Sequence, residues 1–132
     1  MKAVISMKGL AFQKEVDKDL FVGKKIGEKI SGNAIADLGN YEFEITGGSD
    51  KDGFAMRKGM QGAVRKRVLV ATGPGYCPKK MGIRRRKSIC GEVISERIAQ
   101  VNLKVLKEGD KKFDDFIPKK DAPAEGEGEK KE

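Results

Sequence analysis

The sequence contains no histidine and no tryptophan, and only two cysteines, Cys77 and Cys90. Histidine is the commonest general acid–base residue in enzymes and the commonest metal ligand, so its absence excludes Ser-His-Asp triads and His-containing zinc modules. Two cysteines do not complete a four-ligand structural zinc site. They could form a disulfide, but an isolated pair in a chain with intracellular features is more often reduced. We therefore expect neither a metal ion nor another cofactor.

Long apolar stretches are also missing. No segment approaches the ~18 apolar residues of a membrane-spanning helix, and the N-terminal MKAVISMKGLAF has neither the apolar centre nor the cleavage site of a signal peptide. We expect a soluble, cytoplasmic protein without a membrane partner. The chain has 132 residues, 38% of them hydrophobic and 36% charged, which predicts one domain with a modest core and a highly charged surface.

Acidic residues are absent from the middle of the chain. Residues 54–91 include no Asp or Glu but 11 Lys and Arg, six of them arginine, whose planar fork of donors suits phosphate. Because the whole chain has a net charge of +8, the remainder sums to −3. An ordinary solvated surface intersperses charges of both signs. The stretch therefore indicates a polyanionic partner.

The candidate RNA-binding residues lie in the segment 51–88. They are Lys51, Arg57, Lys58, Arg65, Lys66, Arg67, Lys79, Lys80, Arg84, Arg85, Arg86 and Lys87. The chain is only 6% aromatic, and Tyr76 is the one aromatic residue of the Gly- and Pro-containing loop 73–82. Proteins that bind single strands stack bases on several aromatic side chains. The sequence therefore favours recognition of the backbone and shape of folded RNA.

Alternating apolar residues predict about six short strands. They span 2–8, 12–16, 41–46, 65–71, 89–94 and 100–106, with glycine-rich turns between them. This pattern indicates a mainly β fold, a small β-barrel-like domain with at most one or two short helices. One helical turn could form at 33–38 inside the ambiguous segment 21–38. The domain is expected to end near Ile117.

Two further segments have a characteristic composition. The run 47–54 is interpreted as a tight turn, because it lacks the Gly-Lys-Ser/Thr of a phosphate-binding loop and the later ligands of a calcium loop. Residues 118–132 contain no aromatic and no β-branched residue. Such a composition buries too little apolar surface to fold, so we expect a disordered acidic and lysine-containing tail.

Four runs of the sequence resemble a known family. They are 41–54 (YEFEITGGSDKDGF), 65–69 (RKRVL), 73–76 (GPGY) and 82–88 (GIRRRKS). In this order they resemble the ribosomal protein number six of the archaeal and eukaryotic small subunit, in its short archaeal form, over residues 1–117. The resemblance implies a β-barrel-like domain that contacts ribosomal RNA and neighbouring ribosomal proteins, with no catalysis and no small-molecule substrate. Ala55 stands where relatives are expected to carry proline, and the phosphorylated serines of eukaryotic relatives have no counterpart here.

Three functions follow from these observations. The first is a structural constituent of the small ribosomal subunit that binds folded ribosomal RNA through its Lys/Arg-rich segment. The second is a free-standing RNA chaperone or translation regulator with the same basic surface. The third is an enzyme acting on a phosphorylated substrate, with Asp50 or Asp52 as base. It is the least favoured, because these acids lie in an expected turn with no nucleophile beside them.

Overall fold

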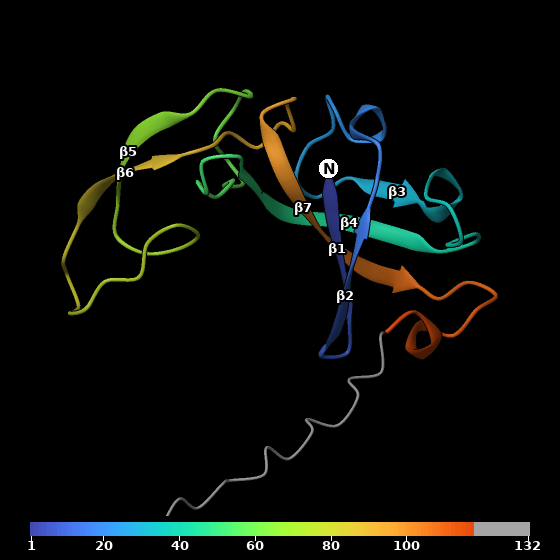
Figure 1. Cartoon of the computed structure of the whole chain (residues 1–132). Coiled ribbons are helices and arrows are strands. Elements are labelled where there is room, and N and C mark those ends of the chain that lie inside the picture. Colours follow the sequence, from blue (N-terminus) through green and yellow to red (C-terminus); the bar gives the residue numbers. More distant parts are fainter. Residues whose placement is uncertain (118–132) are drawn as a thin grey trace, which may run out of the picture.

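The computed structural model describes residues 1–117, which form two β-sheets. The larger sheet contains β1 (Lys2–Met7), β2 (Leu10–Glu15), β3 (Lys29–Ser31), β4 (Glu42–Asp50) and β7 (Ile98–Lys107), in the order β2-β1-β7-β4-β3. The smaller sheet pairs β5 (Lys66–Val70) with β6 (Arg85–Ile89). Figure 1 shows this hairpin projecting from one side of the larger sheet.

The helical elements of the described part are three short 3₁₀ turns. They are η1 (Lys18–Leu20), η2 (Gly32–Ala34) and η3 (Phe113–Phe116). Within residues 1–117, no helix is long and apolar enough to cross a membrane. The regular structure that positions any functional side chain is therefore almost wholly β.

The N-terminal strand lies near the middle of the larger sheet. β1 runs antiparallel to β2 and parallel to β7, and β4 runs antiparallel to both β7 and β3. The β1–β2 connection is the two-residue turn Lys8-Gly9, in which both residues have positive φ angles of 47° and 85°. Positive φ angles at both central residues are typical of a type I′ turn, whose twist matches that of the antiparallel strands it connects.

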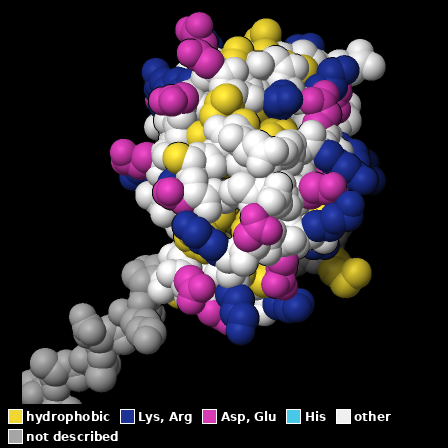
Figure 2. All heavy atoms as spheres, turned by 90° about the vertical axis from the view of Figure 1, so that its right-hand side faces the viewer, with side chains coloured by type: hydrophobic (Ala, Val, Ile, Leu, Met, Phe, Trp, Pro, Cys, Tyr) yellow, Lys and Arg dark blue, Asp and Glu magenta, His cyan; other side chains and the backbone are white. Residues whose placement is uncertain are grey.

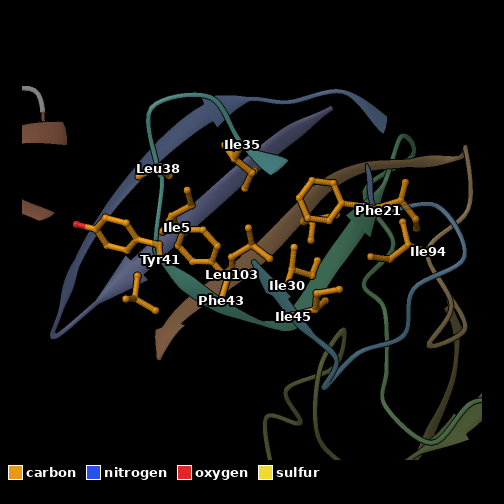
Figure 3. Close-up of a cluster of buried hydrophobic side chains, with 14 of the residues drawn as sticks. Ile5, Phe21, Ile30, Ile35, Leu38, Tyr41, Phe43, Ile45, Ile94 and Leu103 are labelled. Atoms are coloured by element: carbon orange, nitrogen blue, oxygen red, sulfur yellow. The ribbon is translucent and has the colours of Figure 1, made fainter. Parts of the chain in front are cut away.

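One face of the larger sheet forms the core. Alternate residues of the central strands are fully buried on this face, including Ile5 of β1, Phe43 and Ile45 of β4, and Leu103 of β7. Figure 3 shows side chains from the connections, among them Phe21, Leu38 and Ile94, closing over the same cluster. Full burial of a side chain of this size contributes about 1.5–3 kcal/mol relative to exposure. Apolar residues therefore alternate in the sequence because only one face of the sheet is buried.

The mainly β prediction is confirmed, with differences in detail. The larger sheet is open, with β2 and β3 at its edges, so the expected barrel-like closure does not form. The segment 21–38 contains β3 and η2. The predicted strand 89–94 is wrong in its bounds. The observed strand β6 is Arg85–Ile89, so it ends at the residue where the predicted strand begins. The prediction of a disordered tail concerns residues 118–132, which lie outside the described residues.

The glycines after the clearest strand do not form a turn. Gly47 and Gly48 continue β4 as far as Asp50, and the chain turns only at residues 51–53, where Gly53 has a φ of 86°. A Cβ atom on Gly48 would lie 2.5 Å from the carbonyl oxygen of Gln100 in β7. Glycine is needed there because the two strands approach closely beside a bulge in their pairing.

Candidate nucleic-acid interface

We call residues 65–89 the basic arm; it comprises Arg65, β5, β6 and the loop between the two strands. The arm contains nine lysines and arginines and no acidic residue. In Figure 1 it extends to the left of the larger sheet. Of the 12 predicted RNA-binding residues, ten are exposed, and Arg57 and Arg65 are half-buried.

The register of β5 and β6 distributes the charges over both faces of the arm. Residues directly opposite each other in an antiparallel pair project to the same face. The first face contains the pairs Lys66–Ile89, Val68–Lys87 and Val70–Arg85, and the second face contains Arg67–Ser88 and Leu69–Arg86. The first face therefore presents Lys66, Arg85 and Lys87, the last two about 6.5 Å apart along β6, and the second face presents Arg67 and Arg86 on different strands.

The loop of the arm folds back over the first face. Gly73-Pro74-Gly75-Tyr76 is a β-turn in which the Tyr76 amide donates to the Gly73 carbonyl at 3.1 Å, and Gly75 has a φ of 86°. Proline followed by a positive-φ glycine is the signature of a type II turn. A Cβ atom on Gly75 would lie 3.9 Å from the Ile89 side chain. The turn thus brings Tyr76 against β6, where the Lys87 ammonium lies 5.7 Å from the centre of its ring.

Arg65 connects the base of the arm to the larger sheet. Its Nη2 donates to a carboxylate oxygen of Asp50 at 2.7 Å and to one of Asp52 at 2.6 Å. Its guanidinium also lies 4.5 Å from the centre of the Phe54 ring. The sequence predicted a strand over residues 65–71, beginning at Arg65. Instead, Arg65 precedes β5 and is held by protein carboxylates.

The charges at this junction stabilise one another. Burial alone would raise the pKa of the Asp50 carboxyl, but hydrogen bonds from Arg65 and from the Lys51 amide outweigh it, so the pKa lies below its usual range. The bonds to Asp52 and Asp50 raise the pKa of Arg65. Burial, followed by the charge of Asp50, raises the pKa of the neighbouring Cys90 thiol. Asp50 is therefore an ionised structural group with an almost inaccessible side chain.

Lys51, Arg57 and Lys58 are the predicted residues that lie outside the arm. The Lys58 ammonium is 3.5 Å from where a Cβ atom on Gly27 would be. The Arg57 amide donates to the Cys90 carbonyl, and the Arg57 guanidinium lies beneath Gly73, 3.8 Å from where a Cβ atom would be. Lys51 lines a hollow of about 430 Å³ on the larger sheet, together with Glu15, Lys2 and Lys18. The sequence did not single out these last two lysines, because residues so far apart show no common pattern before the chain folds.

The side of the molecule opposite the arm has a different character. Figure 2 looks from the right-hand side of Figure 1, and acidic and basic side chains are interspersed across that face. Exposed ion pairs such as Lys107–Glu42 and Lys14–Asp37 belong to the larger sheet and its connections. On this face positive charge is thus accompanied by carboxylates, whereas residues 66–89 of the arm contain no acidic residue.

The two acids of the enzyme hypothesis are occupied in the fold. Both Asp50 and Asp52 bind the same guanidinium nitrogen, and the Asp50 side chain is only 4% exposed. Within residues 1–117, no group of three or more His, Cys, Asp or Glu side chains could hold a metal ion. The two cysteines are unpaired, Cys77 exposed and Cys90 buried.

Comparison of the sequence with known proteins identifies the family of this chain. The model of the family described as ribosomal protein S6e matches residues 1–118. The chain belongs to the ribosomal protein S6e family. One similar protein is the small ribosomal subunit protein eS6 of Methanococcus maripaludis (strain C5). It is 48% identical over 104 residues, which cover 79% of this chain and 83% of the relative. The Archaeoglobus fulgidus protein of that name is 40% identical over 116 residues, covering 86% and 90%.

Membership of the S6e family confirms several predictions made from the sequence. The four motif runs were correctly interpreted as a resemblance to the sixth small-subunit protein of the archaeal type. The family is a structural, non-enzymatic component of the small ribosomal subunit, a cytoplasmic particle. The enzyme hypothesis is therefore wrong, and the burial and pairing of Asp50 give its physical reason.

Proposed function

We propose that this S6e protein is a structural constituent of the small ribosomal subunit and that its basic arm binds folded ribosomal RNA. The observation that carries the proposal is the hairpin 66–89, which holds eight cations and no acidic residue and projects from the larger sheet, where charges of both signs are mixed. Each Lys or Arg that neutralises a phosphate releases condensed counterions, and this supplies much of the affinity for nucleic acid. Two cationic faces suit a position between RNA segments that would otherwise repel each other.

The RNA contacts are assigned to the exposed cations of the predicted set. They are Lys58, Lys66, Arg67, Lys79, Lys80, Arg84, Arg85, Arg86 and Lys87, with Lys51 on the larger sheet and Arg57 beneath the turn as flanking contacts. Arg65 belongs to the same predicted set, and its two carboxylate partners make it the residue that positions the arm. The mixed-charge face is available to neighbouring ribosomal proteins, the second class of partner that we expect.

Sucrose-gradient cofractionation of the tagged protein with ribosomal subunits tests the proposal. We expect the protein in the small-subunit peak, retained there after a high-salt wash. Replacement of Arg84, Arg85 and Arg86 by alanine should reduce its incorporation, whereas replacement of Lys104, Lys111 and Lys112, which removes the same charge outside the arm, should not. A protein that stays at the top of the gradient, or leaves the peak during the wash, would support the free-standing RNA chaperone or translation regulator instead.

A further inference from the structure

The arm contains a hollow that backbone recognition by itself does not require. Its volume is about 360 Å³, within the range of roughly 300–1,000 Å³ that is usual for small-molecule sites. It lies between the loop and the first face of β6. Its walls are formed by Tyr76, Cys77, Lys79, Ile83, Arg85 and Lys87.

The walls of this hollow combine one aromatic ring with three cations. Tyr76 and Ile83 supply apolar surface, and Lys79, Arg85 and Lys87 supply charge without an acidic residue among them. The Lys87 ammonium lies over the Tyr76 ring, 5.7 Å from its centre, so a cation and an aromatic surface adjoin each other in the wall of the hollow. A flat π-system next to a phosphate is the ligand chemistry that such a surface complements.

The position of Tyr76 is determined by the backbone. The type II turn at 73–76 returns the chain to β6, and its positive-φ Gly75 packs against Ile89, which is fully buried. Arg85 and Lys87 project from the same strand face because they are two residues apart. The ring and the cations are thus held by two elements that are themselves fixed.

We propose that this hollow binds a single unpaired nucleotide of the RNA, with its base stacked on Tyr76 and its phosphate at Lys79, Arg85 and Lys87. The inference rests on the proposed function, since it assigns a subsite within the same arm. The cations continue beyond the hollow to Arg84 and to Arg86 and Arg67 on the second face. Neighbouring phosphates would be neutralised there, which favours a nucleotide within a polynucleotide over a free mononucleotide. One aromatic ring is enough for one base, while the rest of the arm reads the backbone.

Two RNAs that differ by one unpaired nucleotide distinguish the subsite from backbone binding. One is a fully paired stem, and the other is the same stem with one extrahelical adenine. We expect fluorescence anisotropy to show about 5- to 150-fold tighter binding of the second RNA, because stacking one base contributes about 1–3 kcal/mol. Tyr76→Leu should abolish this preference without changing the salt dependence, and Tyr76→Phe should retain it. Equal affinity of the wild-type protein for both RNAs, or a preference that survives in Tyr76→Leu, would overturn the subsite.

Failure of the subsite and failure of the proposed function give different results. If the arm binds RNA but the hollow takes no base, both RNAs bind equally and with a steep salt dependence. If the arm does not bind RNA at all, neither affinity depends steeply on salt.

The exposed Cys77 gives a readout that needs no Tyr76 variant. It lines the hollow, whereas Cys90 is buried, so iodoacetamide should alkylate only Cys77 in the folded protein. At saturating RNA, the stem with the extrahelical adenine should slow alkylation of Cys77, measured by mass spectrometry, more than the paired stem does. Equal protection by the two RNAs would contradict a base in the hollow.

Discussion

At the scale of single residues, the junction between the arm and the larger sheet depends on one guanidinium. Arg65 donates through Nη2 to Asp50 and Asp52 and stacks on the Phe54 ring. A lysine has no planar fork and no flat face, so it would not make the same set of contacts. The Asp50 side chain is almost wholly buried, and the Cys90 thiol lies 3.7 Å from its carboxylate. Most of the stabilisation at the junction therefore depends on this single buried charge being paired.

Removal of the buried carboxylate should destabilise the protein strongly. Asp50→Ala leaves the Arg65 guanidinium without its buried partner, and we expect the free energy of unfolding to fall by roughly 2–3 kcal/mol. Asp52→Ala is the matched control. Its side chain is 63% exposed, so its loss should cost less than about 1 kcal/mol. Urea denaturation followed by circular dichroism measures both changes. Equal effects of the two substitutions would contradict a special role of the buried carboxylate.

The same pair should make stability depend on acid pH. The pKa of Asp50 is lowered in the folded protein, so its contribution is fully present above its unfolded value of about 3.9 and is lost as pH falls through the lower folded value. We expect the urea midpoint of the wild type to drop below about pH 4, and the drop to be smaller in Asp50→Asn. Asp37→Asn is the control. The pKa of the Asp37 carboxyl is also lowered, by its hydrogen bond from Lys14, but this carboxyl is exposed. Parallel pH profiles of the wild type and Asp50→Asn would count against the pairing.

At the scale of the elements, the sequence predicted those strands whose side chains enter the core. Apolar and polar residues alternate in β1, β4 and β7, because every second residue is buried on one face of the larger sheet. The three-residue β3 was missed because only Ile30 is buried in it. β6 was not among the predicted strands, because Arg85, Arg86 and Lys87 are exposed on both faces of the hairpin and show no apolar period.

The candidate site was predictable in its charges and not in its contacts. A run without acidic residues identifies a basic surface whatever its fold, and ten of the 12 chosen side chains are exposed. Two contacts arise only in the folded chain, from the register of β5 and β6 and from the turn at 73–76. Arg65 pairs with Asp50, and Tyr76 lies near Arg85 and Lys87. Neither is visible as a spacing along the chain.

The arginine cluster at the start of β6 should dominate the salt dependence of RNA binding. With about 6–10 phosphates neutralised, log affinity is expected to fall against log salt with a slope between roughly −4 and −9. Replacing Arg84, Arg85 and Arg86 by alanine should flatten that slope by about 2–3, at ~0.7–0.9 for each phosphate that the variant no longer neutralises. The Lys104, Lys111 and Lys112 triple variant makes the same change in net charge and should leave the slope unaltered. An unchanged slope in the arginine variant would remove the cluster from the interface.

At the scale of the whole molecule, the core and the charge lie in different parts. The main hydrophobic cluster consists of residues from the larger sheet and its connections, and extends to Met56 and Cys90 at the junction. Val70 and Ile89, the buried residues of the arm, lie outside that cluster. The larger sheet thus supplies the stability, and the arm adds a surface whose self-repulsion a phosphate backbone would relieve.

This separation predicts that the arm can be removed without unfolding the rest. Lys66 and Ile89 are directly paired, so a two-residue Asn-Gly turn in place of residues 67–88 closes the chain with the connection that suits a hairpin. The replacement removes seven cations and lowers the net charge from +8 to +1. We expect a cooperative urea transition and a β-type circular dichroism spectrum, because the core cluster is intact.

The shortened protein should nevertheless fail to bind RNA with a steep salt dependence and should stay at the top of a sucrose gradient. Its control is the full-length Arg65→Lys variant, in which the arm keeps all its charge but is without the planar contacts at its base. That variant should be less stable and still bind RNA with an unchanged salt slope, because it neutralises the same number of phosphates. An unfolded shortened protein would mean that the arm is part of the core. Its incorporation into the small subunit would assign the binding to the larger sheet, where Lys2, Lys18 and Lys51 share a hollow.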